Sequence, residues 1–306
     1  MTRVAAIDCG TNSIRLLVAD VDPQAGTLVD VDRRMEIVRL GAGVDETGRL
    51  SDAALARTFA ACERFAALLA DLGATRVRFV ATSATRDASN REEFLEGVLA
   101  RLGVAAEVAS GDEEAALSFT GATRELPAAG LTGPYLVVDI GGGSTEIVLG
   151  TDKPEAACSI DVGCVRMSER ILRSDPPTSQ EISAATSAID AMLATAAERV
   201  PLRAGRLIGL AGTVTTVAAA AMGLPRYDPS VIHLARLPAE AVRRTIHWLL
   251  TSDRARRAQL PFMHPGRVDV IGAGGLILDR VLQASAASEL VVSEHDILDG
   301  IAWSLA

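Results

Sequence analysis

The sequence predicts an α/β protein built from two duplicated halves, each containing a mixed sheet. Its 306 residues allow two domains of ordinary size. Apolar residues make up 49% and charged residues 23%, which supports folded cores and excludes a disordered chain. Strand-like and helix-like segments alternate along both halves, a pattern typical of α/β proteins. We expect one domain over 1–125, completed by a C-terminal helix over 295–306, and a second over 134–294.

An internal repeat is the basis for the duplication. Residues 4–18 align without gaps on residues 135–149. The aligned positions share an Asp, a Gly and a Ser between apolar flanks, at Asp8 and Asp139, Gly10 and Gly141, and Ser13 and Ser144. Each copy predicts a buried strand, a tight polar turn and a second strand.

Capping residues and apolar runs predict the other elements of the first half. Ser51 or Asp52 would begin a helix and Gly73 would end it. In chain order we expect a strand over 29–40, a helix over 51–72, a strand over 76–81, a helix over 90–102, a strand over 105–108 and a helix over 112–124. Residues 125–134 hold two prolines and two glycines, which predicts a linker.

The second half repeats the alternation with a more helical end. We expect strands near 136, 147 and 157, helices over 166–172 and 179–199, a strand over 206–210 and then an alanine-rich helix. The remainder, 238–306, reads as largely helical with a short strand over 289–292.

Composition limits the partners. A net charge of −9 and a pI near 5.1 argue against a nucleic-acid binder. Early charges and the absence of a 20-residue apolar run argue against a signal peptide and a membrane partner, so we expect a cytoplasmic protein. Lys153 is the only lysine, so a phosphate-binding loop of the Walker type is absent. Phosphate would have to be bound by amides, hydroxyls, arginine or metal.

The two repeated loops carry the strongest chemical signal. After each strand-ending Asp, a turn rich in Gly, Ser and Thr lets backbone N–H groups converge on an anion. Mg²⁺ takes one or two carboxylates together with substrate oxygens, and Mn²⁺ is an alternative. We expect a phosphate cleft between the domains, with Asp8, Asp139 and Glu146 as the metal-associated carboxylates. Ordinary hairpin turns are the plain alternative for either loop alone.

Three further segments fit phosphate chemistry. The turn at Gly212 and Thr213 leaves a strand and opens a helix, whose first amides favour anions. Arg86 follows a predicted strand and offers a forked donor for phosphate oxygens, although a surface arginine before a helix cap at Asn90 would look the same. Glu113 and Glu114 begin a helix, where they serve either as capping charges or as a general base, and the sequence does not choose between them.

The histidines and cysteines give no metal signal. His233, His247, His264 and His295 are scattered, with no two at ligand spacing, so we expect no zinc site. The four cysteines form no Cys-x-x-Cys pair and read as reduced thiols.

Taken in order, these motifs closely resemble the exopolyphosphatase / guanosine-pentaphosphate phosphohydrolase family. The matching segments are 8–13, 81–90, 110–115, 139–146 and 209–213, with later matches at 269–274 and 293–300. The resemblance runs from Val4 to about Trp303. It implies a duplicated actin-like, ribonuclease H-like fold with two domains around a central cleft.

The resemblance also implies an activity: Mg²⁺-dependent removal of the terminal phosphate of inorganic polyphosphate. It implies Glu114 as the catalytic base, and Asp139 and Glu146 as catalytic carboxylates associated with the metal and the water. The expected phosphate-binding residues are Asn12, Ser13, Arg86, Gly141, Gly142, Gly143, Ser144, Thr145, Gly212 and Thr213. Longer members carry additional helical domains, so this short form is expected to prefer short chains.

Two other functions remain open at this point. The same residues would hydrolyse guanosine pentaphosphate, and the motifs do not separate the two substrates. A nucleotide- or alarmone-binding regulator that has lost turnover is the alternative from another class, and the joint presence of Glu114, Asp139 and Glu146 argues against it. The resemblance also implies a homodimer.

Overall fold

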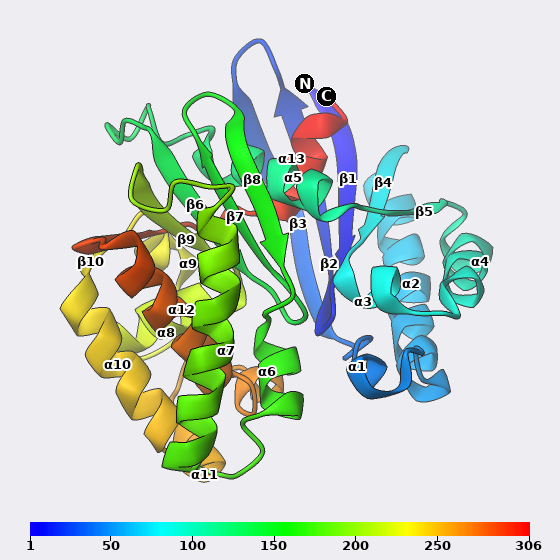
Figure 1. Ribbon diagram of the computed structural model, residues 1–306. Helices are drawn as coiled ribbons and strands as arrows, with labels where there is room; N and C mark the ends of the chain where they lie inside the picture. Colours follow the sequence, from blue (N-terminus) through cyan, green and yellow to red (C-terminus); the bar gives the residue numbers. More distant parts are fainter. The chain divides into compact units, whose positions relative to one another are not determined.

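The computed structural model describes residues 1–306, which divide into two compact units (Figure 1). The first unit comprises Met1–Gly121 together with Ile297–Ala306, and the second comprises Ala122–Asp296. The chain therefore passes from one unit to the other twice. No helix combines the length and apolar character that spanning a bilayer requires.

The first unit is built on a five-stranded sheet of order β3-β2-β1-β4-β5. The first three strands are antiparallel neighbours, whereas β4 lies parallel to β1, and β5 parallel to β4. The strands are β1 (Thr2–Cys9), β2 (Ser13–Asp22), β3 (Thr27–Ile37), β4 (Arg76–Ala81) and β5 (Ala106–Val108). The helices are α1 (Val44–Thr47), α2 (Asp52–Leu72), α3 (Ser83–Asp87), α4 (Arg91–Leu102), α5 (Gly111–Thr123) and α13 (Ile297–Ser304).

The second unit is built on a six-stranded sheet of order β10-β11-β9-β6-β7-β8. Its strands are β6 (Tyr135–Ile140), β7 (Thr145–Gly150), β8 (Pro154–Ile160), β9 (Arg206–Leu210), β10 (Arg236–Pro238) and β11 (Glu289–Val292). Its helices are α6 (Cys164–Arg170), α7 (Ser179–Ala197), α8 (Ala211–Ala221), α9 (Pro229–Ile232), α10 (Ala239–Thr251), α11 (Arg254–Ala258) and α12 (Ile271–Ser285), with a 3₁₀ turn at Pro265–Arg267.

The two sheets share one topology. In each, three antiparallel strands come first in the chain, and two later strands add in parallel on the other side of the first strand. The second sheet has in addition the edge strand β10, which is antiparallel to β11. β1, β2, β3, β4 and β5 thus correspond to β6, β7, β8, β9 and β11. The predicted α/β architecture of two duplicated halves with mixed sheets is confirmed.

Both faces of β1, the central strand of the first sheet, are buried. In β1, Ala5 and Ile7 belong to the apolar cluster that contains residues of α2 and α4, whereas Val4 and Ala6 belong to the cluster that contains α13. This is why β1 reads as a continuous apolar run rather than an alternating one. Helix α13 is fixed further by Asp299, whose Oδ1 accepts from Arg33 Nη2 on β3 at 2.6 Å.

Most expected elements are present within a few residues of their predicted bounds. Ser51 caps α2 by accepting the N–H of Ala54, and Gly73 ends that helix at φ 68°. The segment after β4, expected as a loop, instead contains the short helix α3. Asn90 does not cap α4 with its side chain. Its side-chain Oδ1 instead accepts the N–H of Leu50, and its Nδ2 donates to the carbonyl of Leu50.

Candidate active site

The motif segments of the first unit leave the sheet at one edge. Thr82, directly after β4, donates its N–H to the carbonyl of Cys9 at the end of β1, and Ala109 N–H, after β5, donates to the Ala81 carbonyl. A side-chain contact of 3.0 Å between Thr11 and Ser83 joins the first two segments. The carboxyl ends of parallel strands form this edge, which is where α/β proteins place their ligands.

The two repeated loops adopt the same turn. The Gly10 N–H donates to the Ser13 carbonyl at 2.9 Å, and the Gly141 N–H donates to the Ser144 carbonyl at 3.0 Å. The first glycine amide of each loop therefore closes the turn. In the second loop, the N–H groups of Gly142, Gly143 and Ser144 make no backbone–backbone hydrogen bond, so they are the donors that an anion would use.

Asp8, in the first loop, pairs with an arginine. Its Oδ2 accepts from Arg15 Nη2 at 2.7 Å and from Nε at 3.0 Å, and the aspartate is 5% exposed. The carboxylate is thus partly neutralised by an arginine from β2. Asn12 and Ser13 lie half-buried in the same turn, and the Asn12 carbonyl accepts the N–H groups of Val38 and Arg39.

Glu113 and Glu114 have different surroundings. Glu114 is 8% exposed, and its Oε2 accepts from Arg86 Nη1 at 2.8 Å. The same arginine nitrogen donates to the Ala109 carbonyl at 2.9 Å, which fixes the guanidinium between the ends of α3 and β5. The Glu113 side chain is 43% exposed and pairs with Arg78 at 2.6 Å. The structure brings Glu114 together with Arg86 and places Glu113 in a separate surface ion pair.

In the second unit, two carboxylates and a hydroxyl form a row across three strands. Asp139 on β6 pairs in register with Glu146 on β7, and Glu146 pairs with Ser159 on β8. Residues directly opposite on neighbouring strands project from the same face of a sheet. Ser159 Oγ donates to Glu146 Oε1 at 2.7 Å. Asp139 is 6% and Glu146 1% exposed, so both carboxylates are buried.

The segment that follows β8 donates hydrogen bonds to the carbonyl groups of the second loop. The carbonyl of Gly142 accepts from Val165 and Arg166, and Arg166 Nε donates to the Gly143 carbonyl at 2.8 Å. A Cβ at Gly163 would lie 2.3 Å from the Gly142 carbonyl oxygen, so a glycine is required there. Thr145 Oγ1 donates its proton to the Val162 carbonyl, so the hydroxyl proton is already used in a hydrogen bond within the protein.

The third loop leaves the same sheet beside the second one, since Asp139 pairs with Leu210 at the end of the parallel strand β9. Ala211 has φ 65° at the start of α8. A Cβ at Gly212 would collide with the Arg267 guanidinium, and that group also donates to Thr216 Oγ1 at 3.1 Å. The loop of Gly212 and Thr213 thus lies against an arginine that sequence analysis did not single out.

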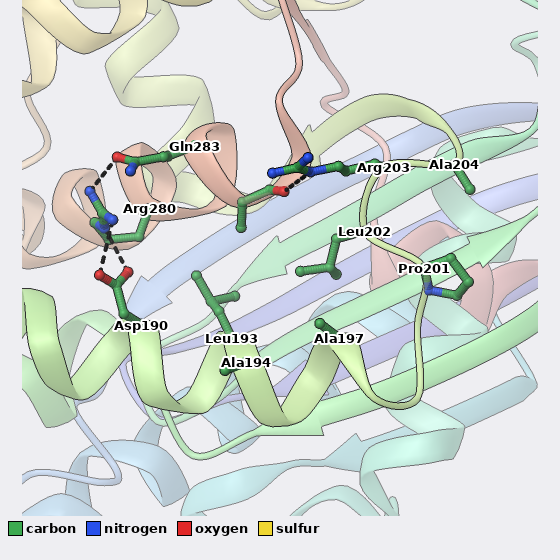
Figure 2. Close-up of a pocket in the computed structure, with 11 residues that line it drawn as sticks. Asp190, Leu193, Ala194, Ala197, Pro201, Leu202, Arg203, Ala204, Arg280 and Gln283 are labelled. Carbon is green, nitrogen blue, oxygen red and sulfur yellow. Dashed lines mark hydrogen bonds and ion pairs between the residues drawn. The ribbon is translucent and has the colours of Figure 1, made fainter.

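An open pocket lies elsewhere on the second unit, between α7, the turn after it and α12 (Figure 2). Leu193, Ala197 and Leu202 form its apolar wall, and an ion pair between Arg280 and Asp190 at 2.7 Å closes one side. None of the predicted site residues lines it. The pocket is therefore distinct from the glycine-rich loops.

A duplicated α/β fold with glycine-rich loops, buried carboxylates and loop-associated arginines defines a phosphate-processing enzyme. The Ppx/GppA phosphatase family matches residues 17–306. This chain belongs to that family.

Several relatives resemble the chain over its full length. Exopolyphosphatase 2 of Mycobacterium tuberculosis H37Rv is 51% identical, with 100% of this chain and 99% of that protein covered. The crystal structure of the Aquifex aeolicus Ppx/GppA family member is 30% identical, with a TM-score of 0.83 and 99% and 97% of the two chains covered. The guanosine-5'-triphosphate,3'-diphosphate pyrophosphatase of Vibrio vulnificus is 30% identical over 99% of this chain but 56% of its own length. The family resemblance expected from the motifs is confirmed.

Proposed function

We propose that this protein is an exopolyphosphatase, which hydrolyses the terminal phosphoanhydride of inorganic polyphosphate and releases orthophosphate. The observation that carries the proposal is the 51% identity to exopolyphosphatase 2 over essentially the whole of both chains. The structure supports the proposal with three buried carboxylates, at Glu114, Asp139 and Glu146, and with loop amides that make no backbone–backbone hydrogen bond.

Glu114 is proposed as the general base. A base must be held in one position and must have a partner that fixes its orientation. Glu114 meets both conditions, because it is buried and Arg86 holds one of its oxygens at 2.8 Å. A carboxylate oxygen of Glu114 is proposed to take a proton from the attacking water. Glu113 is less suited, since Arg78 holds it at the surface.

Asp139 and Glu146 are proposed to hold Mg²⁺, with Mn²⁺ as the alternative. Their donor set fits a hard cation, because both offer carboxylate oxygens from adjacent positions on neighbouring strands and both are buried. Bound there, the cation would neutralise charge on the transferring phosphoryl group and on the leaving oxygen. Asp8 is a further candidate ligand, and its Oδ2 accepts from Arg15 Nη2 at 2.7 Å.

The phosphate itself is proposed to bind to the loop groups. The N–H donors of Gly142, Gly143 and Ser144, with the side chains of Asn12, Ser13, Arg86 and Thr213, supply amides, hydroxyls and a cation. Such fixed donors stabilise the charge that develops in phosphoryl transfer. With a net charge of −9, long-range attraction cannot recruit a polyanion, so local donors must do so.

Guanosine pentaphosphate is the second candidate substrate, favoured by the similarity to the Vibrio pyrophosphatase. The purified protein should be offered polyphosphates of defined length and guanosine pentaphosphate, with orthophosphate release measured with Mg²⁺, with Mn²⁺ and with excess chelator. The proposal predicts a higher kcat/KM for polyphosphate, short chains preferred, and loss of activity in chelator. Faster orthophosphate release from guanosine pentaphosphate would make that compound the preferred substrate. Full activity in excess chelator would refute the metal-dependent mechanism.

The setting of the enzyme is also a proposal. We propose a cytoplasmic location, because no apolar segment fits a membrane span, and a homodimer, because of the family resemblance. Light scattering of the purified protein tests the dimer, which predicts twice the 31.9 kDa mass of the chain.

A further inference from the structure

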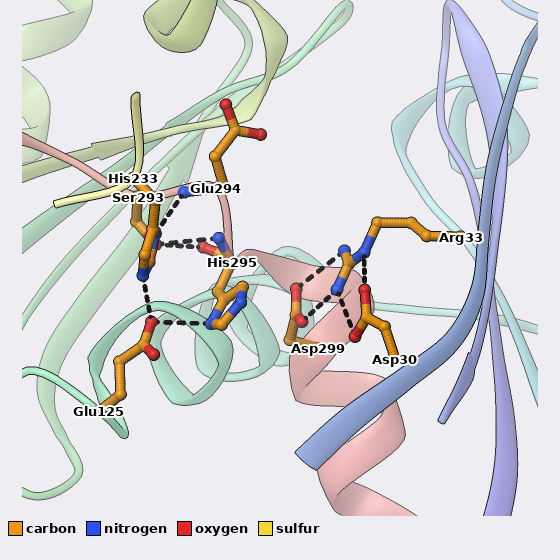
Figure 3. A network of polar contacts seen from close by, with 8 residues as sticks. All are labelled: Asp30, Arg33, Glu125, His233, Ser293, Glu294, His295 and Asp299. Atoms are coloured by element: carbon orange, nitrogen blue, oxygen red, sulfur yellow. Dashed lines mark hydrogen bonds and ion pairs between the residues drawn. The ribbon is translucent and has the colours of Figure 1, made fainter. Parts of the chain in front are cut away.

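Two histidines that are far apart in the sequence meet at one glutamate in the second unit (Figure 3). His233 follows α9, His295 precedes α13, and Glu125 follows α5. Glu125 Oε1 lies 2.7 Å from His233 Nε2 and 2.7 Å from His295 Nδ1. Sequence spacing could not reveal this cluster, because its members are separated by 62 residues or more.

From this geometry we infer that Glu125, His233 and His295 bind one divalent cation of the zinc class, at a site separate from the phosphate loops. The three donor atoms lie within 4.8 Å of one another. Two imidazoles and one carboxylate match the ligand set of three-residue zinc sites. Nitrogen ligands of this kind favour Zn²⁺, Co²⁺ or Ni²⁺ over Mg²⁺, which prefers oxygen.

The buried atoms of the cluster are the second observation. Glu125 Oε1 and His233 Nε2 are both inaccessible to solvent, and neither makes a hydrogen bond of good geometry although they lie 2.7 Å apart. A cation bound to both atoms would satisfy them together. Burial alone would raise the pKa of Glu125, but the two histidines outweigh it and hold the pKa well below its usual range. The carboxylate is therefore in the ionised form that a metal requires.

The fit needs only small movements. Zinc bonds of 2.0–2.2 Å in tetrahedral geometry set neighbouring ligand atoms roughly 3.3 Å apart. Each imidazole would have to move away from Oε1 by about half an ångström relative to the observed contacts. His295 and Glu125 are each about one-third exposed, which leaves a path for the ion and room for a water ligand.

One hydrogen bond of His233 disfavours cation binding at its Nε2. The Glu294 N–H donates to His233 Nδ1 at 3.2 Å, which places the proton of a neutral His233 on Nε2. A cation at Nε2 would move this proton to Nδ1 and break that long hydrogen bond. The rival occupant is thus a proton shared between the histidines and Glu125, and the experiment must separate the two.

The proposed cation site lies next to both places where the chain passes between the units. The chain passes between the units after Gly121 and again after Asp296. Glu125 lies four residues after the first passage and His295 one residue before Asp296. A cation held by both would link the two connecting segments within the second unit, so its binding should stabilise the folded protein.

The test is zinc binding to the full chain after chelator treatment and dialysis. Calorimetry should give one tight equivalent of Zn²⁺, and Co²⁺ should produce the visible absorption of a tetrahedral site. Glu125→Gln, His233→Gln and His295→Gln should each weaken affinity by at least about tenfold. His247→Gln, which changes an exposed histidine, and Asp139→Asn should leave the affinity unchanged.

Circular dichroism and Tm without metal show whether each variant folds, and the cobalt spectrum of any two folded variants suffices for the test. Zinc affinity that is unchanged by all three substitutions would overturn the proposal. So would a protein that binds no zinc but loses pH-dependent stability in His295→Gln, because the cluster would then hold a proton. Loss of zinc affinity in Asp139→Asn would assign the ion to the phosphate loops instead.

Discussion

Ser159 supports Glu146 through a single hydrogen bond, and its removal should weaken metal activation. The hydroxyl donates to Glu146 Oε1 at 2.7 Å, and the glutamate is 1% exposed. A hydrogen bond to a charged group contributes about 1.5–3 kcal/mol. If Ser159→Ala lost this contribution entirely from cation binding, the affinity for Mg²⁺ would fall roughly ten- to hundredfold.

The assay is orthophosphate release from polyphosphate as a function of Mg²⁺ concentration. The concentration for half-maximal activity should rise at least about tenfold in Ser159→Ala, while activity at saturating Mg²⁺ changes much less. Ser187→Ala is the matched control, because its hydroxyl donates to the Ser183 carbonyl on an exposed face of α7. An unchanged Mg²⁺ requirement in a folded Ser159→Ala protein would refute the positioning of Glu146 by this hydroxyl.

Three further predictions concern stability. Ile301 is fully buried where α13 packs, so Ile301→Ala opens a cavity there. The free energy of unfolding measured in urea should fall by about 2–5 kcal/mol. A decrease below about 1 kcal/mol would mean that α13 is not part of the core. Hydrogen bonds, the largest contribution being that of the Thr178 backbone N–H, lower the pKa of Glu181 to about 2, so the stability from this capping box is complete above pH 4.5 and is lost as the pH falls towards 2. Over that range the Tm of the wild type should fall more steeply than the Tm of Glu181→Gln. An equal fall of Tm in the two proteins would contradict this. Asp175→Ala leaves the buried Arg257 without its 2.9 Å partner and should destabilise the protein by about 3 kcal/mol. An unchanged Tm would show that the pair contributes nothing to stability.

Local patterns predicted the architecture well. The repeated Asp-x-Gly loops, the cap at Ser51 and the glycine at Gly73 depend on neighbouring residues, and the structure confirms the two duplicated halves and the bounds of α2. Helix α3 was missed, because its five residues are too few to show a helical period.

The site was predicted less completely, because its contacts join distant segments. Glu113 and Glu114 are adjacent in sequence, and only the positions of Arg78 and Arg86 distinguish them. Ser159 reaches Glu146 through the register of two strands. Arg267 lies against Gly212 although 55 residues separate them. No local pattern carries this information.

The central claim is that Glu114 is the base of a phosphoanhydride hydrolase. The most direct measurement compares kcat for polyphosphate in Glu114→Gln and Glu113→Gln, with polyphosphate binding followed by calorimetry. We predict at least about a hundredfold loss of kcat in Glu114→Gln with binding retained, and a change of less than about threefold in Glu113→Gln. Near-normal turnover in Glu114→Gln, or an equal loss in Glu113→Gln, would contradict the account.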